Sequence, residues 1–138
     1  GQAMRMGLNR DLGFSAADRS ENLRRSMELA RLMNSVGTIC LAAFVAPEDR
    51  AREAAKELIG HDRFLLVHLS TPLEVCKERD ASGLYERHQD GLHASIPGVT
   101  QPYESPNDAD LKIDTSTTST TDAGEQVISL LKSHNIID

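Results

Sequence analysis

The sequence has 138 residues, of which 39% are hydrophobic, and carries a formal net charge of −6 with an isoelectric point near 5.3. This size predicts one domain, residues 1–138, with a real core, and the acidic balance argues against a nucleic-acid binder, which needs a basic face. We find no apolar run of about 18 residues and no charged-then-apolar leader, so we expect no membrane segment and a cytoplasmic location.

The distribution of arginines, cysteines and histidines indicates which kind of binding site the chain can contain. Six of the eleven arginines fall between residues 5 and 31, which indicates a small anion pocket within an acidic protein. Cys40 and Cys76 lie in apolar-patterned segments without metal-ligand spacing, so we interpret them as reduced core thiols. The five histidines are scattered, and no metal ligands are expected.

The first half of the chain predicts a helix, a strand and a second helix. Apolar residues at three- and four-residue steps predict an amphipathic helix that is capped by Asp18 or Ser20 and ends near Gly37. The continuous apolar run 38–45 predicts a strand buried on both faces. A helix over 47–59 follows, opened by a proline.

The second half continues the alternation. It predicts a strand at 64–69, a helix at 73–78, a strand at 110–114 and a helix at 122–133. Apolar strands that alternate with helices predict an α/β fold: a three-layer parallel sheet with helices on both faces, joined by right-handed crossovers. Ligands of such sheets gather at the carboxyl ends of the strands.

A glycine-punctuated loop that leads into the first long helix carries the groups best suited to a nucleotide. The guanidiniums of Arg5 and Arg19 can bind phosphate or sulfate oxygens bidentately. Asn9 and Asn22 can read polar edges, and Phe14 offers a flat face for a purine. From these residues alone, an ordinary polar loop and helix cap explains the segment equally well.

This loop resembles the substrate loop of adenylyl-sulfate kinases (APS kinases), a P-loop NTPase family with the pattern Arg-x-Gly-Leu-Asn-Lys/Arg-Asp-Leu-Gly-Phe-Ser-x-x-Asp-Arg-x-x-Asn. Residues 72–85 resemble the family's second signature, and Gly98 with residues 102–104 resembles the end of its lid. The resemblance covers essentially the whole chain. It implies a P-loop kinase-like fold and identifies the long irregular stretch, about residues 80–106, as a lid over a nucleotide.

The resemblance implies phosphoryl transfer from MgATP to the 3′-hydroxyl of adenylyl sulfate (APS), giving 3′-phosphoadenylyl sulfate (PAPS), in sulfate assimilation. The residues implied to hold APS are Arg5, Asn9, Phe14, Arg19 and Asn22, with the backbone of Val45 and Ala46. Arg79 is implied to stack on the ATP adenine, although its neighbours alone favour a salt bridge with Asp80 or Glu78. The implied partners are these nucleotides, further copies of the chain and, through fusion, an ATP sulfurylase domain.

The chain also departs from the family. No G-x-x-x-x-G-K-[ST] motif occurs in the sequence, although that motif holds the transferred phosphates and Mg²⁺. We therefore expect the N-terminal strands and the P-loop to precede Gly1, and residues 1–138 alone to be inactive. Gln2 stands at an acidic position of the family, and an amide cannot act as a base. No catalytic residue is assigned.

The lid differs from the family as well. The family's Lys-Gly-Phe-Thr-Gly is replaced by Ala94, Ser95, Ile96, a proline and Gly98, which removes a cation and an aromatic ring. Ala46 replaces a serine. These changes leave a second hypothesis open: a catalytically weak or inactive APS kinase-like regulatory domain of a sulfate adenylyltransferase, which binds APS or PAPS. A domain that only holds an oligomer together is a third, and the retained arginines argue against it.

Overall fold

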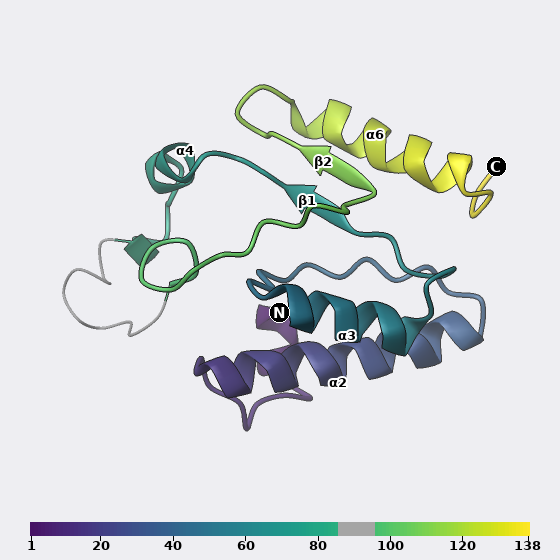
Figure 1. The fold of residues 1–138 in the computed structure, drawn as a ribbon, viewed down its shortest axis with the longest axis horizontal. Coiled ribbons are helices and arrows are strands. Elements are labelled where there is room, and N and C mark those ends of the chain that lie inside the picture. The colour runs from purple at the N-terminus through teal and green to yellow at the C-terminus, as the bar shows by residue number, and fades with distance from the viewer. Residues whose placement is uncertain (86–95) are drawn as a thin grey trace. The chain divides into compact units, whose positions relative to one another are not determined.

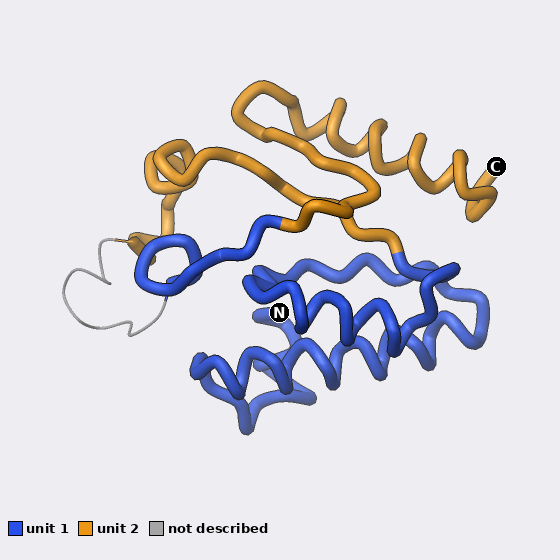
Figure 2. Tube along the Cα trace, in the orientation of Figure 1, with its two compact units in different colours: residues 1–64, 94–105 blue, residues 65–93, 106–138 orange. Residues whose placement is uncertain are grey.

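The computed structural model describes residues 1–85 and 96–138 (Figure 1). Its elements follow one another as α1 (Gln2–Arg5), α2 (Ala16–Ser35), α3 (Asp49–Ile59), β1 (Val67–Leu69), α4 (Leu73–Glu78), β2 (Leu111–Ile113) and α6 (Thr120–Ser133). The chain divides into two compact units, residues 1–64 with 94–105 and residues 65–93 with 106–138 (Figure 2). The α/β class is confirmed, and the single domain over 1–138 stays a prediction.

The long helix α2 of the first unit begins where a serine caps it. Ser15 Oγ accepts a hydrogen bond from the backbone N–H of Asp18 at 3.1 Å and donates to the Asp18 carboxylate at 2.8 Å. This arrangement satisfies one of the free N–H groups of the first helical turn. The predicted cap, Asp18 or Ser20, is therefore wrong, because Asp18 is the partner of the cap. The predicted end near Gly37 is confirmed.

Helices α2 and α3 pack side by side and share the core of the first unit (Figure 1). Leu23 and Met27 of α2 and Ala55 of α3 are buried there. The partly buried residues that pack against them are Phe44, Ala46, Ala51, Leu58, Ile59 and Phe64. Removal of these apolar side chains from water holds the two helices together.

Residues 38–45 do not form the buried strand that their apolar run predicts. The segment is irregular, and Leu41 at its centre is 84% exposed. A strand needs a neighbour for its backbone groups, and no strand among the described residues pairs with this one. Ala43 O instead accepts a hydrogen bond from the amino group of Gly1 at 2.9 Å. An apolar composition favours burial, but a paired neighbour decides whether a strand forms.

The second unit contains a two-stranded parallel sheet. In β1 and β2, Val67 pairs with Leu111 and Leu69 with Ile113. Both strands are shorter than predicted, but the parallel order is confirmed. Helix α6 packs on β2 and begins at Thr120 because Ser119 Oγ accepts a hydrogen bond from the third helical N–H at 3.1 Å. Helix α4 has the predicted bounds.

The structure bears on the expectations for membrane helices, cysteines, metal ligands and histidines. Within residues 1–85 and 96–138, no helix is long and apolar enough to cross a membrane, and the cytoplasmic location stays a prediction. Cys40 and Cys76 are free thiols at half-buried positions, so neither is a core residue. In the same part of the chain, no three His, Cys, Asp or Glu side chains come together as a metal site. His88 and His93 lie outside the described residues.

Candidate functional site

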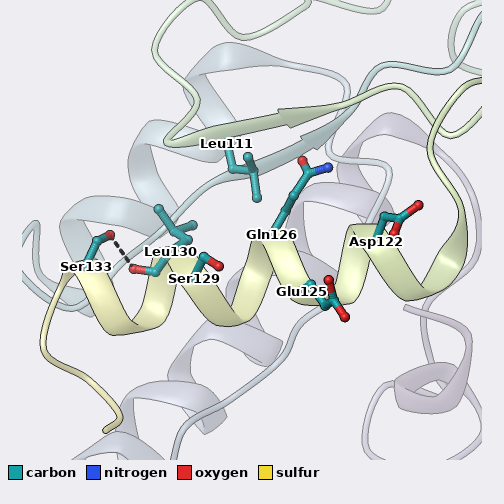
Figure 3. Close-up of a pocket in the computed structure, with 7 residues that line it drawn as sticks. All are labelled: Leu111, Asp122, Glu125, Gln126, Ser129, Leu130 and Ser133. Atoms are coloured by element: carbon teal, nitrogen blue, oxygen red, sulfur yellow. Dashed lines mark hydrogen bonds between the residues drawn. The ribbon is translucent and has the colours of Figure 1, made fainter.

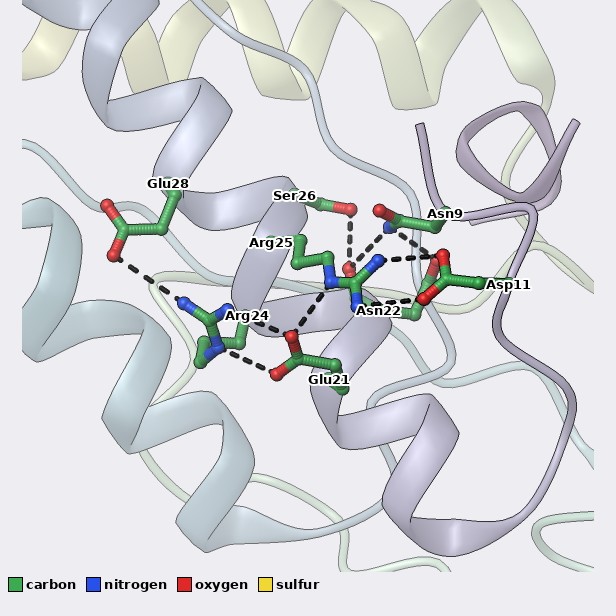
Figure 4. A network of polar contacts seen from close by, with 8 residues as sticks. All are labelled: Asn9, Asp11, Glu21, Asn22, Arg24, Arg25, Ser26 and Glu28. Atoms are coloured by element: carbon green, nitrogen blue, oxygen red, sulfur yellow. Dashed lines mark hydrogen bonds and ion pairs between the residues drawn. The ribbon is translucent and has the colours of Figure 1, made fainter. Parts of the chain in front are cut away.

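The N-terminal loop, residues 6–15, is attached to α2 by a buried pair of amides. Asn9 is 0% exposed and Asn22 is 1% exposed. Asn9 Nδ2 donates to Asn22 Oδ1 at 2.9 Å and to the Asn22 carbonyl at 3.3 Å (Figure 4). Such polar groups are stable in an interior because they are hydrogen-bonded to each other. The structure thus brings together two residues that the sequence predicted for one site. The other polar atom of the Asn9 side chain, Oδ1, accepts no hydrogen bond from the described residues.

A second attachment lies at the surface of the same loop. Arg25 donates from Nη1 and Nη2 to the two carboxylate oxygens of Asp11 at 2.8 and 2.9 Å, and from Nε to Glu21 at 2.8 Å (Figure 4). Hydrogen bonds from Arg24 and then Arg25 lower the pKa of Glu21 to about 2. The hydrogen bond from Arg25 also lowers the pKa of Asp11. The sequence analysis missed Arg25, although its i,i+4 spacing from Glu21 was a usable signal.

Arg5 and Phe14 form a cation–aromatic pair at the two ends of the loop. The Arg5 guanidinium lies 4.7 Å from the centre of the Phe14 ring, and its Nε donates to the Gly13 carbonyl at 3.1 Å. A side chain at Gly13 would place its Cβ 3.1 Å from an Asp18 carboxylate oxygen, so the turn favours glycine. Phe14 is nevertheless 58% exposed, which leaves the ring accessible to a ligand.

Arg19 lies in the first turns of α2 and is electrostatically coupled to Arg5. Its partial burial, and then the positive charge of Arg5, lower the pKa of its guanidinium. Its Nη1 donates to Gln101 Oε1 at 3.4 Å. An anion bound beside Arg19 would stabilise its positive charge, which burial and the neighbouring Arg5 disfavour. Gln101, which the sequence analysis did not single out, belongs to this group, whereas Gln2 lies exposed on α1.

The last part of the predicted lid is a tight turn. The Ile96 carbonyl accepts hydrogen bonds from Val99 N at 3.0 Å and from Thr100 N at 2.9 Å. Gly98 has φ +82°, a left-handed conformation that favours glycine. Ile96 is 6% exposed, so its side chain is packed rather than presented to a ligand. Ala94 and Ser95 lie outside the described residues.

Arg79 lies in the second unit and is held by a threonine rather than by a carboxylate. Its Nη1 donates to the carbonyl and to the hydroxyl of Thr115, both at 3.1 Å. The Thr115 hydroxyl lies 2.6 Å from that of Thr71, so residues that follow β1 and β2 meet at the carboxyl ends of these strands. In the described part of the chain, Arg79 forms no ion pair with Asp80 or Glu78. Asp80 accepts bonds from residues 82 and 85 instead.

A groove on α6 is a poor candidate for an anionic nucleotide. Its lining residues are Leu111, Asp122, Glu125, Gln126, Ser129, Leu130 and Ser133 (Figure 3). Two carboxylates face this groove and no cation lines it, so phosphate or sulfate would be repelled. The candidate site is therefore the arginine–aromatic cluster of the first unit.

The first unit places the Arg5 guanidinium against the accessible Phe14 ring, and the charge of Arg19 interacts with that of Arg5. Guanidiniums and an exposed ring are groups suited to bind an anionic nucleotide. The family model described as adenylylsulphate kinase matches residues 1–114, and the chain belongs to this family. The family predicted from the sequence is thereby confirmed.

Individual relatives agree. The bifunctional enzyme CysN/CysC of Rhodopirellula baltica is 52% identical over 132 residues, which are 96% of this chain and 20% of that protein. The adenylyl-sulfate kinase of Shewanella pealeana is 47% identical over 116 residues, 84% of this chain and 57% of that protein. The chain thus spans less than two thirds of either relative. The Mycobacterium tuberculosis APS kinase CysC, solved in complex with AMPPNP and APS, matches with a TM-score of 0.89 and 36% identity over 95% of this chain and 76% of that one.

Proposed function

We propose that this chain is the APS-binding part of an adenylyl-sulfate kinase, which transfers a phosphoryl group from ATP to the 3′-hydroxyl of APS and gives PAPS in sulfate assimilation. The observation that carries the proposal is the cluster of Arg5, Arg19 and Phe14. The paired guanidiniums would bind the sulfate and phosphate of APS, and the exposed ring would stack on its adenine. The name and bound nucleotides of the Mycobacterium tuberculosis structure support this assignment.

The family resemblance implies roles for the other residues, and their hydrogen bonds support some of these roles. Asn9 and Asn22 would fix the loop so that the arginines and the ring reach APS together, and the backbone of Val45 and Ala46 would line the same pocket. Arg79, oriented by Thr115, would stack on the ATP adenine. Phosphoryl transfer depends mostly on positioning and charge stabilisation, and these groups would contribute to the positioning of the nucleotides.

The proposed function includes a larger parallel sheet than the two strands β1 and β2. Residues 38–45 and β1 would be members of one larger parallel sheet with helices on both faces, completed by strands and a P-loop that the sequence of residues 1–138 does not contain. The exposed Leu41 and the TM-score of 0.89 to a longer APS kinase chain support this assignment. The apolar run would then be buried as its composition predicts.

Magnesium accompanies ATP in this family. Among the described residues, however, no cluster of three or more ligating side chains offers a site, and the P-loop hydroxyl that would contact the ion is not in this sequence. These residues would therefore act on the nucleotide rather than on the ion. What they would supply is the binding of APS and the orientation of its 3′-hydroxyl.

A second candidate is a regulatory APS kinase-like domain that binds APS or PAPS without turnover. Gln2 supports it, because an exposed amide at the family's acidic position cannot take a proton from the 3′-hydroxyl. Fusion to a second enzyme domain, as the name bifunctional enzyme CysN/CysC of the Rhodopirellula baltica relative suggests, fits either candidate. The ATP sulfurylase domain implied by the family resemblance would be such a domain. A homo-oligomer also fits either candidate, and it would cover the exposed apolar residues on the second half of α2 and directly after it: Leu29, Leu32, Met33 and Val36.

The deciding experiment measures ADP release and PAPS formation by the full-length protein with MgATP and APS, beside calorimetric titration with APS. Turnover supports the kinase. Tight APS binding without turnover supports the regulator. Absence of both contradicts the proposal. Residues 1–138 alone should show no turnover, since they contain no amide cradle or lysine for the γ-phosphate.

A further inference from the structure

A buried arginine on α3 occupies the point where three segments of the first unit meet. Arg52 is 7% exposed. Its Nη1 donates to the Ala46 carbonyl at 2.5 Å, and its Nη2 donates to the Glu104 carbonyl at 2.5 Å and to the Asp49 carboxylate. A buried charge is costly unless it is paired and hydrogen-bonded. The guanidinium is therefore fixed by its partners, and it fixes them in return.

One of those partners has an unusual backbone conformation. Ala46 has φ +39°, in the left-handed region that residues with a Cβ seldom adopt. Such a conformation persists only where the surroundings hold it. The bond from Arg52 restrains the Ala46 carbonyl, and thus the direction of the peptide between Ala46 and Pro47 and the backbone conformation of Ala46.

The second set of partners lies at the end of the lid segment. Glu104 N donates to the Pro47 carbonyl at 2.8 Å, and the Glu104 carboxylate accepts from Asp49 N at 2.6 Å, at the positive end of α3. The Tyr103 ring lies 5.8 Å from the Arg52 guanidinium carbon. The residues that follow the tight turn at 96–101 are thus attached to the loop that precedes α3.

We propose that Arg52 is a positioning residue that couples the end of the lid to the backbone of Val45 and Ala46. It would hold the end of the lid and the backbone of Val45 and Ala46 in one fixed arrangement, so that both can contact the same bound APS. The inference rests on the proposed function, because the pocket role of Val45 and Ala46 belongs to that proposal. Arg52 itself would not touch APS, since its Nη groups bind protein carbonyls and a carboxylate.

The test compares Arg52→Lys and Arg52→Gln with the wild type in the full-length protein, by initial-rate kinetics in both substrates. The KM for APS should rise about tenfold or more, because misplaced binding groups lose that order of effect, while the KM for ATP stays unchanged. Lysine should not rescue the effect, since one ammonium cannot span two carbonyls as a planar fork does. Arg50→Gln is the matched control: Arg50 lies on the same helix, is 85% exposed and pairs with Glu48.

Because a buried arginine can be needed for folding, Glu104→Ala serves as the second variant. Its carboxylate is exposed, and its loss removes the bond to Asp49 N without changing Arg52. It should raise the KM for APS in the same direction, with a fall in the melting temperature small enough that the protein stays folded. An unaltered KM for APS in both folded variants would overturn the inference, as would equal rises in the two KM values. A wild type that neither binds nor uses APS would instead overturn the proposed function.

Discussion

Asn9 and Asn22 face each other in the interior of the first unit, and the 2.9 Å bond between their side chains ties the N-terminal loop to α2. No apolar residue of that loop is buried. The hydrogen bond between these amides thus holds the loop against α2, whereas apolar packing holds α2 and α3 together. A loop held by directional bonds presents its arginines and its aromatic ring in a defined geometry.

Asn22→Ala should lower the free energy of unfolding by about 1–3 kcal/mol, because it leaves the buried Asn9 amide with an incomplete set of partners. Urea denaturation of the full-length protein measures the change. Ser20→Ala, at an exposed position of the same helix, should change it by about 0.5 kcal/mol or less. Equal effects of the two substitutions would show that the amide pair adds nothing beyond helix propensity.

Arg19→Ala should weaken APS binding by about 1.5–3 kcal/mol, the usual value of a partly desolvated guanidinium–anion contact. Calorimetric titration of the full-length protein with APS measures it. Arg10 lies exposed in the N-terminal loop, residues 6–15. Arg10→Ala changes the net charge by the same amount and should weaken APS binding less than Arg19→Ala does. An unchanged dissociation constant for Arg19→Ala would reduce Arg19 to a surface charge at the start of a helix.

Acid should weaken the ion pairs that Glu21 forms with Arg24 and Arg25 on α2. Hydrogen bonds from Arg24 and Arg25 lower the pKa of this carboxylate from 4.5 to about 2 in the folded protein. The unfolded chain therefore binds the proton more readily between these values, and the stabilisation, complete above pH 4.5, is lost as the pH falls towards 2. Glu21→Gln should flatten this part of a stability-versus-pH curve from urea denaturation. Glu57→Gln, an equal charge change at an exposed position of α3, should leave the slope in place.

Ile96→Phe tests whether the family's aromatic residue can return to the lid. Because Ile96 is 6% exposed, a larger ring must displace its neighbours, and we expect a loss of about 1–3 kcal/mol in stability without tighter nucleotide binding. Thermal unfolding and APS titration measure the two quantities. Val99→Phe, at a position that is 41% exposed in the same turn, is the control and should be tolerated. Tighter binding in Ile96→Phe would mean that the ring reaches the nucleotide after all.

The sequence by itself determined the family, the presence of helices α2, α3, α4 and α6 and the parallel order of two strands, whereas the short helix α1 was not predicted. Periodicity placed α4 at its observed bounds and ended α2 near Gly37, because helices are stabilised by contacts between residues close in the chain. The arginine-rich loop could be read for the same reason, since its pattern is continuous in sequence. Its predicted contacts with APS stay predictions.

The tertiary structure decided what depends on distant residues. It left 38–45 irregular because backbone pairing needs a neighbouring strand, which no local pattern guarantees. It turned Asn9 towards Asn22 and buried Arg52 under carbonyls up to 52 positions away, contacts that carry no local signal. Local periodicity fixes which face of a helix is apolar, but the partner of a polar side chain is settled only when remote segments meet.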